Sequence, residues 1–295
     1  MKQFIFTGIW FFLALNLTAQ NPTQHNIISK VSTKSNSTQK GAKGTELKIA
    51  YTLPSISMDQ IDEEINNVPK FIFQIQILKN SIPIRSAEGW EKFSDKNGDF
   101  LYEYEVIKNV AKNVEEESTF FIPHAALSLE TGTNKDISFV VSISGKDAEG
   151  KNYHQKTVEK GVKINMTPTY LFTLDIDFVE ATILDRKERA WDYAFIGTSA
   201  PDMKTLITLG DFTFWKYLLD NTYMFNIGEK SKNIKFRVLQ TDEIYLYFLD
   251  EDPIIDQTIG VFKISAEKLK PDTKYSYSNA FQNVKSCNFS YSVSF

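Results

Sequence analysis

The stretch Phe172-Thr-Leu-Asp-Ile-Asp-Phe178 decides the fold class of this chain. Its apolar residues occupy every second position, and threonine or aspartate stands between them. In an extended backbone such alternation places the two kinds of side chain on opposite faces. The stretch therefore predicts a half-buried β-strand that packs one face against a core.

The same alternation recurs in the first half of the chain. Residues 73–77 and 137–143 are apolar at every second position, around one apolar exception at Val140. Turn-forming clusters at residues 95–98 and 147–150 separate such runs. Only residues 57–66 and 265–270 favour helices, and both are too short to form a layer of their own. We predict an all-β protein.

A change of pattern near residue 167 suggests two domains. Asn165-Met-Thr-Pro-Thr169 contains a proline, which cannot donate a backbone hydrogen bond within a sheet, and the strand quoted above follows it directly. Pieces of about 120 residues are typical of β-sandwiches. We therefore expect two β-sandwich domains in tandem, residues 46–167 and 168–295.

The first residues resemble a processing signal. Lys2 is followed by an uncharged apolar stretch over residues 4–17, and Thr18-Ala19 ends in a small residue suited to cleavage. We predict a signal peptide over residues 1–19 and export to the periplasm, the cell surface or the medium. The stretch is shorter than the ~20 residues of a membrane-spanning helix, so we expect no transmembrane segment in the mature chain. A retained N-terminal anchor is the alternative.

Residues 20–45 are rich in Asn, Gln, Ser, Thr and Lys and have almost no aromatic residues. Such a composition buries too little apolar surface to offset the entropy of ordering the chain. We therefore predict a flexible spacer between the signal peptide and the first sandwich.

Composition argues against several classes of function. The chain has 33 basic and 37 acidic residues and a net charge of -4, so it lacks the basic surface that nucleic-acid binding requires. Cys287 is the single cysteine, and the three histidines show no metal-binding spacing. Gly197-Thr-Ser-Ala200 does not have both flanking glycines of a nucleophile elbow, and no other nucleophile has an evident base. We expect a non-catalytic protein, although a glycosidase-like pair of carboxylates stays open.

An acidic loop follows a predicted strand in the second half. Residues 244–249 alternate apolar and aromatic side chains and run into Asp250-Glu-Asp-Pro-Ile-Ile-Asp256. Asp250 and Asp252 point the same way on an extended backbone, and Asp256 can close the loop from its other side. Crowded carboxylates repel one another, and Ca²⁺ prefers six to eight oxygen ligands. The spacing favours a calcium site, with a solvated turn as the alternative.

Residues 168–290 resemble a C2-type domain, a calcium-dependent, membrane-binding β-sandwich. The resemblance rests on the strand at residues 172–178, an acidic loop that ends in Asp202, the strand at 244–249 and the Asp-x-Asp loop that follows it. It implies that Asp192 and Asp202 are ligands from the first loop. It also implies that Asp250, Asp252 and Asp256 are ligands from the third loop.

The sequence thus predicts an exported, non-catalytic binding protein whose C2-like sandwich holds calcium at one end. The ion would order the acidic loops and bridge to anionic lipid, a glycan or a partner protein. The alternative is a metal-independent scaffold or assembly subunit of the cell envelope, in which sheet edges supply the interfaces.

Overall fold

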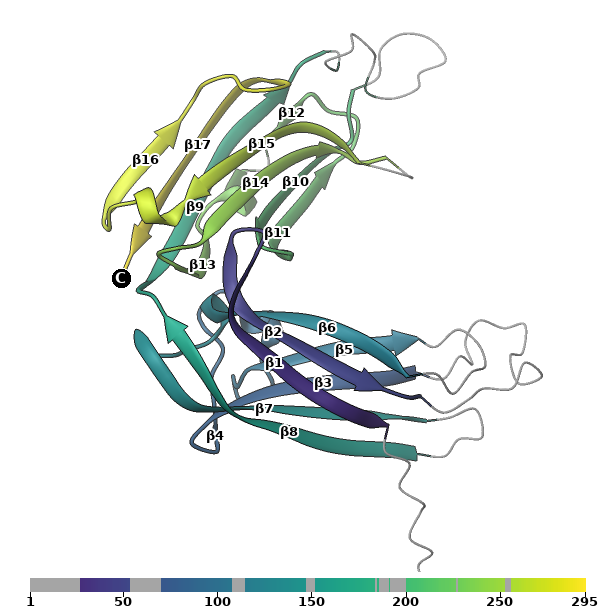
Figure 1. Ribbon diagram of the computed structural model, residues 1–295. Coiled ribbons are helices and arrows are strands. Elements are labelled where there is room, and N and C mark those ends of the chain that lie inside the picture. The colour runs from purple at the N-terminus through teal and green to yellow at the C-terminus, as the bar shows by residue number, and fades with distance from the viewer. Residues whose placement is uncertain are drawn as a thin grey trace, which may run out of the picture.

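The computed structural model describes residues 27–53, 70–107, 115–146, 152–183, 185, 191, 200–226, 228–252 and 256–295. These residues form antiparallel sheets arranged as two β-sandwiches, which confirms the predicted all-β class (Figure 1). Strand pairing changes from one sandwich to the other between Met166 and Thr169. Among the described residues, no helix is long and apolar enough to cross a membrane.

The first sandwich packs a three-stranded sheet against a five-stranded one. The smaller sheet has the order β1 (Ile28–Gln39), β2 (Ala42–Tyr51), β6 (Glu116–Pro123). In the larger sheet β3 (Lys70–Lys79) pairs with β4 (Ile82–Pro83), β5 (Leu101–Ile107) and β7 (Gly132–Lys146), and β7 pairs with β8 (Asn152–Met166). The alternating apolar residues of β3 and β7 are buried, as their pattern predicts.

The hairpin of β1 and β2 corrects the prediction of a flexible spacer over residues 20–45 for its part from residue 28 onward. The predicted signal peptide, residues 1–19, and residues 20–26 of the predicted spacer lie outside the described residues. Residues 28–45 form β1 and the start of β2, joined by a tight turn at Lys40 and Gly41, both with positive φ. Backbone pairing with β2 holds β1, and Gln155 of β8 bonds to both the N–H and the C=O of Ile28. A polar edge strand can therefore be ordered although its composition offers little apolar surface.

The second sandwich has two sheets built around β9 (Thr169–Ala181) and β14 (Glu243–Asp250). In one sheet, β9 pairs on one side with β12 (Met224–Phe225) and β13 (Ile234–Leu239), and on the other side with β17 (Val284–Ser294). The far edge of β17 pairs with β16 (Thr273–Tyr277). The other sheet has the order β11 (Phe212–Leu219), β10 (Met203–Leu209), β14, β15 (Gln257–Ser265).

Two local predictions for this sandwich need qualification. The strand of residues 172–178 exists, but its register with β17 shifts at Asp177, so Val179 is buried and Phe178 only half-buried. A bulge of this kind reverses the alternation beyond the extra residue. The predicted helix at 265–270 is a single 3₁₀ turn, η6 (Ala266–Lys268), and the one at 57–66 lies outside the described residues.

Trp90 is the main link between the two sandwiches. It stands just before the 3₁₀ turn η3 (Glu91–Phe93) of the first sandwich and is 0% exposed. Its ring meets Phe214 of β11 edge to face at 4.4 Å, and its indole N–H donates to the Arg237 carbonyl of β13 at 3.0 Å. The Arg237 N–H in turn donates to the Glu88 carbonyl. The loop at residues 88–90 thus docks on β13 through backbone bonds and a buried aromatic ring.

The β1–β2 turn makes a second link. Gln39 and Lys40 both bond to the Asp211 carboxylate, and the Glu243 N–H donates to the Gly41 carbonyl at 3.0 Å. The buried Asp242 carboxyl accepts the N–H of Lys43 from the first sandwich at 3.1 Å and that of Leu239 from the second at 2.8 Å. Two separate contacts therefore fix the relative orientation of the sandwiches.

A glycine comparison tests the docking of residues 88–90. A Cβ on Gly89 would stand 2.4 Å from the Phe236 Cα, whereas one on Gly161, also at positive φ, would meet nothing within 4 Å. We expect Gly89→Ala to lower the free energy of unfolding by about 2 to 4 kcal/mol in urea titrations. Gly161→Ala should cost only about 1 kcal/mol. Equal losses in both variants would show that close approach to Phe236 does not matter.

The Asp242 carboxyl predicts a pH dependence. Burial raises its pKa from 3.8 to about 7, although two backbone N–H bonds oppose the shift. Between these values the unfolded chain has lost the proton and the folded chain keeps it, so the stability that this proton supplies falls as pH rises towards 7. Relative to Asp242→Asn, the wild type should lose on the order of 2 kcal/mol between pH 5 and pH 8 in urea titrations. Parallel pH profiles of the two proteins would contradict this assignment.

Candidate functional site

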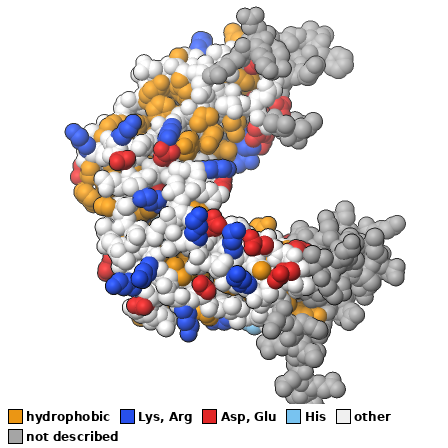
Figure 2. Space-filling view, viewed as in Figure 1, with side chains coloured by type: hydrophobic (Ala, Val, Ile, Leu, Met, Phe, Trp, Pro, Cys, Tyr) orange, Lys and Arg blue, Asp and Glu red, His pale blue; other side chains and the backbone are white. Residues whose placement is uncertain are grey.

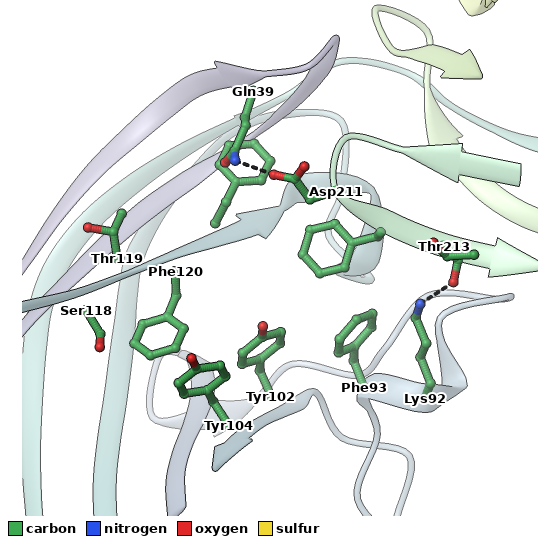
Figure 3. A pocket seen from close by; sticks show the side chains of 12 residues that line it. Gln39, Lys92, Phe93, Tyr102, Tyr104, Ser118, Thr119, Phe120, Asp211 and Thr213 are labelled. Carbon is green, nitrogen blue, oxygen red and sulfur yellow. Dashed lines mark hydrogen bonds between the residues drawn. The ribbon is translucent and has the colours of Figure 1, made fainter. Parts of the chain in front are cut away.

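A cleft of about 600 Å³ lies between the two sandwiches. In the space-filling view the molecule is hollowed between its two lobes (Figure 2). Both sandwiches contribute lining side chains, which are either aromatic or able to form hydrogen bonds. The aromatic ones are Phe93, Tyr102, Tyr104, Phe120, Phe121 and Phe212, and the polar ones are Gln39, Lys92, Ser118, Thr119, Asp211 and Thr213 (Figure 3).

Aromatic rings form a continuous wall along this cleft. Phe212 meets Phe93 edge to face at 5.2 Å, and Phe93 stacks with Tyr102 at 5.5 Å. Phe120, which is only 5% exposed, continues the row and meets Tyr102 edge to face at 5.9 Å and Tyr104 edge to face at 5.2 Å. Tyr104 remains 45% exposed at the end of the row. The wall thus runs from the second sandwich across the open side of the first.

The two strands beside the wall have free edges. Among the described residues β5 pairs only with β3, and β6 pairs only with β2. Alternation on β5 directs Tyr102 and Tyr104 to one face, and their neighbours Glu103 and Glu105 to the other. On the opposite side of this sandwich, bonds from Gln155 to Ile28 and from the Asn165 N–H to Asn36 join β8 to β1. The cleft therefore occupies the open side.

Charged groups at the cleft are engaged with protein partners. The Asp211 carboxylate bonds to Gln39 and Lys40, and its hydrogen bond and charge raise the pKa of Lys40. The Lys92 ammonium donates to the Thr213 carbonyl and lies 5.0 Å from the Phe93 ring centroid. Burial lowers the pKa of Lys92. Asp211 and Lys92 thus each bond to the other sandwich, and the hydroxyl and amide groups supply the rest of the polar lining.

Sequence reasoning did not identify this cleft. Its residues come from five segments that are far apart in the chain, and only folding brings them together. One local signal is present at Tyr102-Glu-Tyr104-Glu, where bulky rings alternate with acids and neither face is purely apolar. Such a strand suits a face that is neither core nor bulk solvent.

The predicted calcium ligands lie at one end of the second sandwich. Asp250 ends β14, is 0% exposed, and accepts the N–H of Asp202 at 2.8 Å. The Asp202 carboxylate accepts the N–H of Asn221 at 2.7 Å, and its carbonyl accepts the N–H of Glu251 at 2.9 Å. The structure thus brings Asp202 and Asp250 together, and their hydrogen bonds join the segment before β10 to the end of β14.

A lysine lies among the neighbouring acids. The Lys204 ammonium is 2.6 Å from the Asp256 carboxylate and 2.9 Å from that of Glu251. Burial alone would lower the pKa of Lys204, but its bonds to Asp256 and Glu251 outweigh burial and raise it. The hydrogen bond from Lys204 lowers the pKa of Glu251. Lys204 therefore pairs with two of the acids at this end, and Lys216 lies 3.5 Å from Glu251 as well.

The donor set can be compared with what calcium requires. Asp252 accepts a hydrogen bond from Gln257 at 3.0 Å, so each of the four described aspartates has a protein partner. Within the described ranges, no group of three His, Cys, Asp or Glu side chains is arranged to hold a metal ion. Asp192 lies outside the described residues. Calcium would have to displace Lys204 from Asp256, and the calcium assignment stays a prediction.

Comparison with known proteins gives weak likenesses only. No protein-family model and no curated protein matches the chain. The calcium-bound pair of C2 domains of Extended-Synaptotagmin 2 matches with a TM-score of 0.32 and 9% identity, covering 77% of this chain and 97% of that one.

Two further solved structures give similar values. The SMP domain of Extended-Synaptotagmin 2 together with the same pair of C2 domains matches with a TM-score of 0.34 and 12% identity over 82% of this chain and 60% of that one. Human GIVD cytosolic phospholipase A2 matches with a TM-score of 0.25 and 9% identity, covering 91% of this chain and 33% of that one. Because all of these TM-scores lie below 0.5, the likenesses assign neither a family nor a function to this chain.

Proposed function

We propose that this protein is an exported, non-catalytic binding protein that holds its ligand in the cleft between its two sandwiches. The observation that carries the proposal is the cleft itself, about 600 Å³ in volume and lined from both sandwiches by aromatic rings and a few polar groups. Ligand sites in proteins have this size and chemistry and lie preferentially at domain interfaces.

The rigid link between the sandwiches supports the proposal. Trp90 and the β1–β2 turn contact the second sandwich on either side of the cleft, so its walls are positioned before a ligand arrives. A preformed site avoids the entropic cost of ordering its walls on binding. The N-terminal stretch that resembles a signal peptide supports export, and the lack of a nucleophile motif supports a non-catalytic role.

Blocking the cleft tests this proposal. Thr119 lines the cleft and is exposed, so Thr119→Trp should fill the space with little effect on the core. Thr133→Trp is the control at an exposed position outside the cleft. We expect a ligand found among neutral oligosaccharides, phosphatidylserine vesicles and short peptides to raise the melting temperature of the wild type and the control but not of Thr119→Trp.

Two results would contradict the cleft as the binding site. A ligand that stabilises all three proteins equally must bind elsewhere. If no class of ligand stabilises the wild type, the metal-independent scaffold becomes the better explanation, with the free edges of β5 and β6 as its interfaces.

Calcium binding by a C2-like second sandwich is the second candidate, because Asp202, Asp250, Asp252 and Asp256 gather at one end of it. We expect millimolar calcium to leave the melting temperature unchanged relative to magnesium or a chelator, because Lys204 already pairs with Asp256 and the other three aspartates already accept protein hydrogen bonds. A calcium-selective rise that Asp250→Asn with Asp252→Asn abolishes would establish the second candidate instead. Anionic lipid would then join glycans and proteins as a ligand to test.

A further inference from the structure

The aromatic wall has the chemistry of a surface on which sugar rings stack. A pyranose ring has an apolar C–H face and a rim of hydroxyl groups, so it packs on an aromatic ring while its rim forms hydrogen bonds. Tyr102 and Tyr104 occupy alternate positions of β5, and the buried Phe120 ring meets both of them edge to face, at 5.9 Å and 5.2 Å. Two lining rings at alternate positions of one strand suit neighbouring units of a saccharide chain better than one small molecule.

Polar groups face this wall across the cleft. Figure 3 shows the Tyr102 hydroxyl pointing into the space, with Gln39 and Asp211 opposite it and Ser118 and Thr119 at one end. Hydroxyl and amide groups both donate and accept hydrogen bonds, which matches the dual character of sugar hydroxyls. The Tyr102 hydroxyl is protonated at neutral pH and can donate, and burial raises its pKa further.

The charges at the cleft favour a neutral ligand. Asp211 is bonded to Lys40 and Gln39, and Lys92 is bonded to the Thr213 carbonyl beside two aromatic rings. A charged ligand would compete with these contacts, which also join the sandwiches. A neutral ligand can use the rings and hydroxyl groups without disturbing them.

We infer that the cleft binds a neutral saccharide chain, whose rings pack on Tyr102 and Tyr104 and whose hydroxyl groups meet Gln39, Tyr102 and Ser118. The inference rests on the proposed function and names the ligand class of the same site. An extended peptide added to the free edges of β5 or β6 would instead depend on backbone bonds, whereas side chains from five segments line this cleft.

Calorimetric titration with defined oligosaccharides tests the inference. The probes are the neutral hexasaccharides of β-1,4-glucose, β-1,4-xylose, β-1,4-mannose and α-1,4-glucose, with hexagalacturonic acid as the anionic counterpart. Tyr104→Ala removes the most exposed ring of the wall, and Tyr275→Ala on β16 is the control for a half-buried tyrosine outside the cleft. Tyr102→Phe removes only a hydroxyl group and keeps the ring.

We expect at least one neutral hexasaccharide to bind, with about tenfold or greater weakening in Tyr104→Ala. Tyr102→Phe should bind more weakly than the wild type, and Tyr275→Ala should bind equally well. Hexagalacturonic acid should bind no better than the neutral probes.

Three results would overturn the inference. The first is that no neutral hexasaccharide binds the wild type. The second is that a neutral hexasaccharide binds Tyr104→Ala and the wild type with equal affinity. The third is that only hexagalacturonic acid, phosphatidylserine vesicles or peptides bind. In the third case, loss of binding in Thr119→Trp would show that the cleft is still the binding site but that its ligand is not a neutral saccharide. Failure of the ligand class can therefore be distinguished from failure of the proposed function.

Discussion

The burial of Trp90 in the second sandwich is the contact on which the arrangement of this molecule depends. The indole is fully enclosed, meets Phe214 edge to face, and donates its N–H to the Arg237 carbonyl. Large buried aromatic side chains contribute several kcal/mol each, and this one spans two domains. Close approach at Gly89 leaves no room for a side chain between the loop and Phe236. The two sandwiches are therefore joined by a buried ring as well as by a few residues of chain.

The cleft is a consequence of that coupling. Its walls come from the open side of the first sandwich and from the β10–β11 turn of the second, and neither part alone would enclose it. On its rim, a hydrogen bond from Gln39 and an ion pair from Lys40 hold the β1–β2 turn against Asp211. Architecture and binding are thus linked, because the contacts that orient the sandwiches are also those that shape the site. The acidic end of the second sandwich is stabilised separately, by the lysine between Asp256 and Glu251.

Much of the fold could be predicted from local pattern. Alternation marked the strands around Phe73, Ile137 and Phe172, because a sheet with one buried face imposes a period of two. It failed at residues 28–45, where backbone pairing rather than apolar burial orders β1, and after Asp177, where a bulge shifts the alternation. The residues of the cleft could not be found in this way. Tyr102, Phe120 and Phe212 are neighbours only in space, and the partnership of Lys204 with Asp256 spans two strands.

The distance between the sandwiches in solution tests the central claim most directly. Cys287 is buried and its thiol pKa is raised to about 11, so spin labels should attach only to cysteines introduced at the exposed positions Lys156 and Lys268. Pulsed electron paramagnetic resonance should then give one narrow distance distribution in the full chain without ligand. A broad or bimodal distribution would show that the sandwiches move independently, and would contradict a preformed cleft.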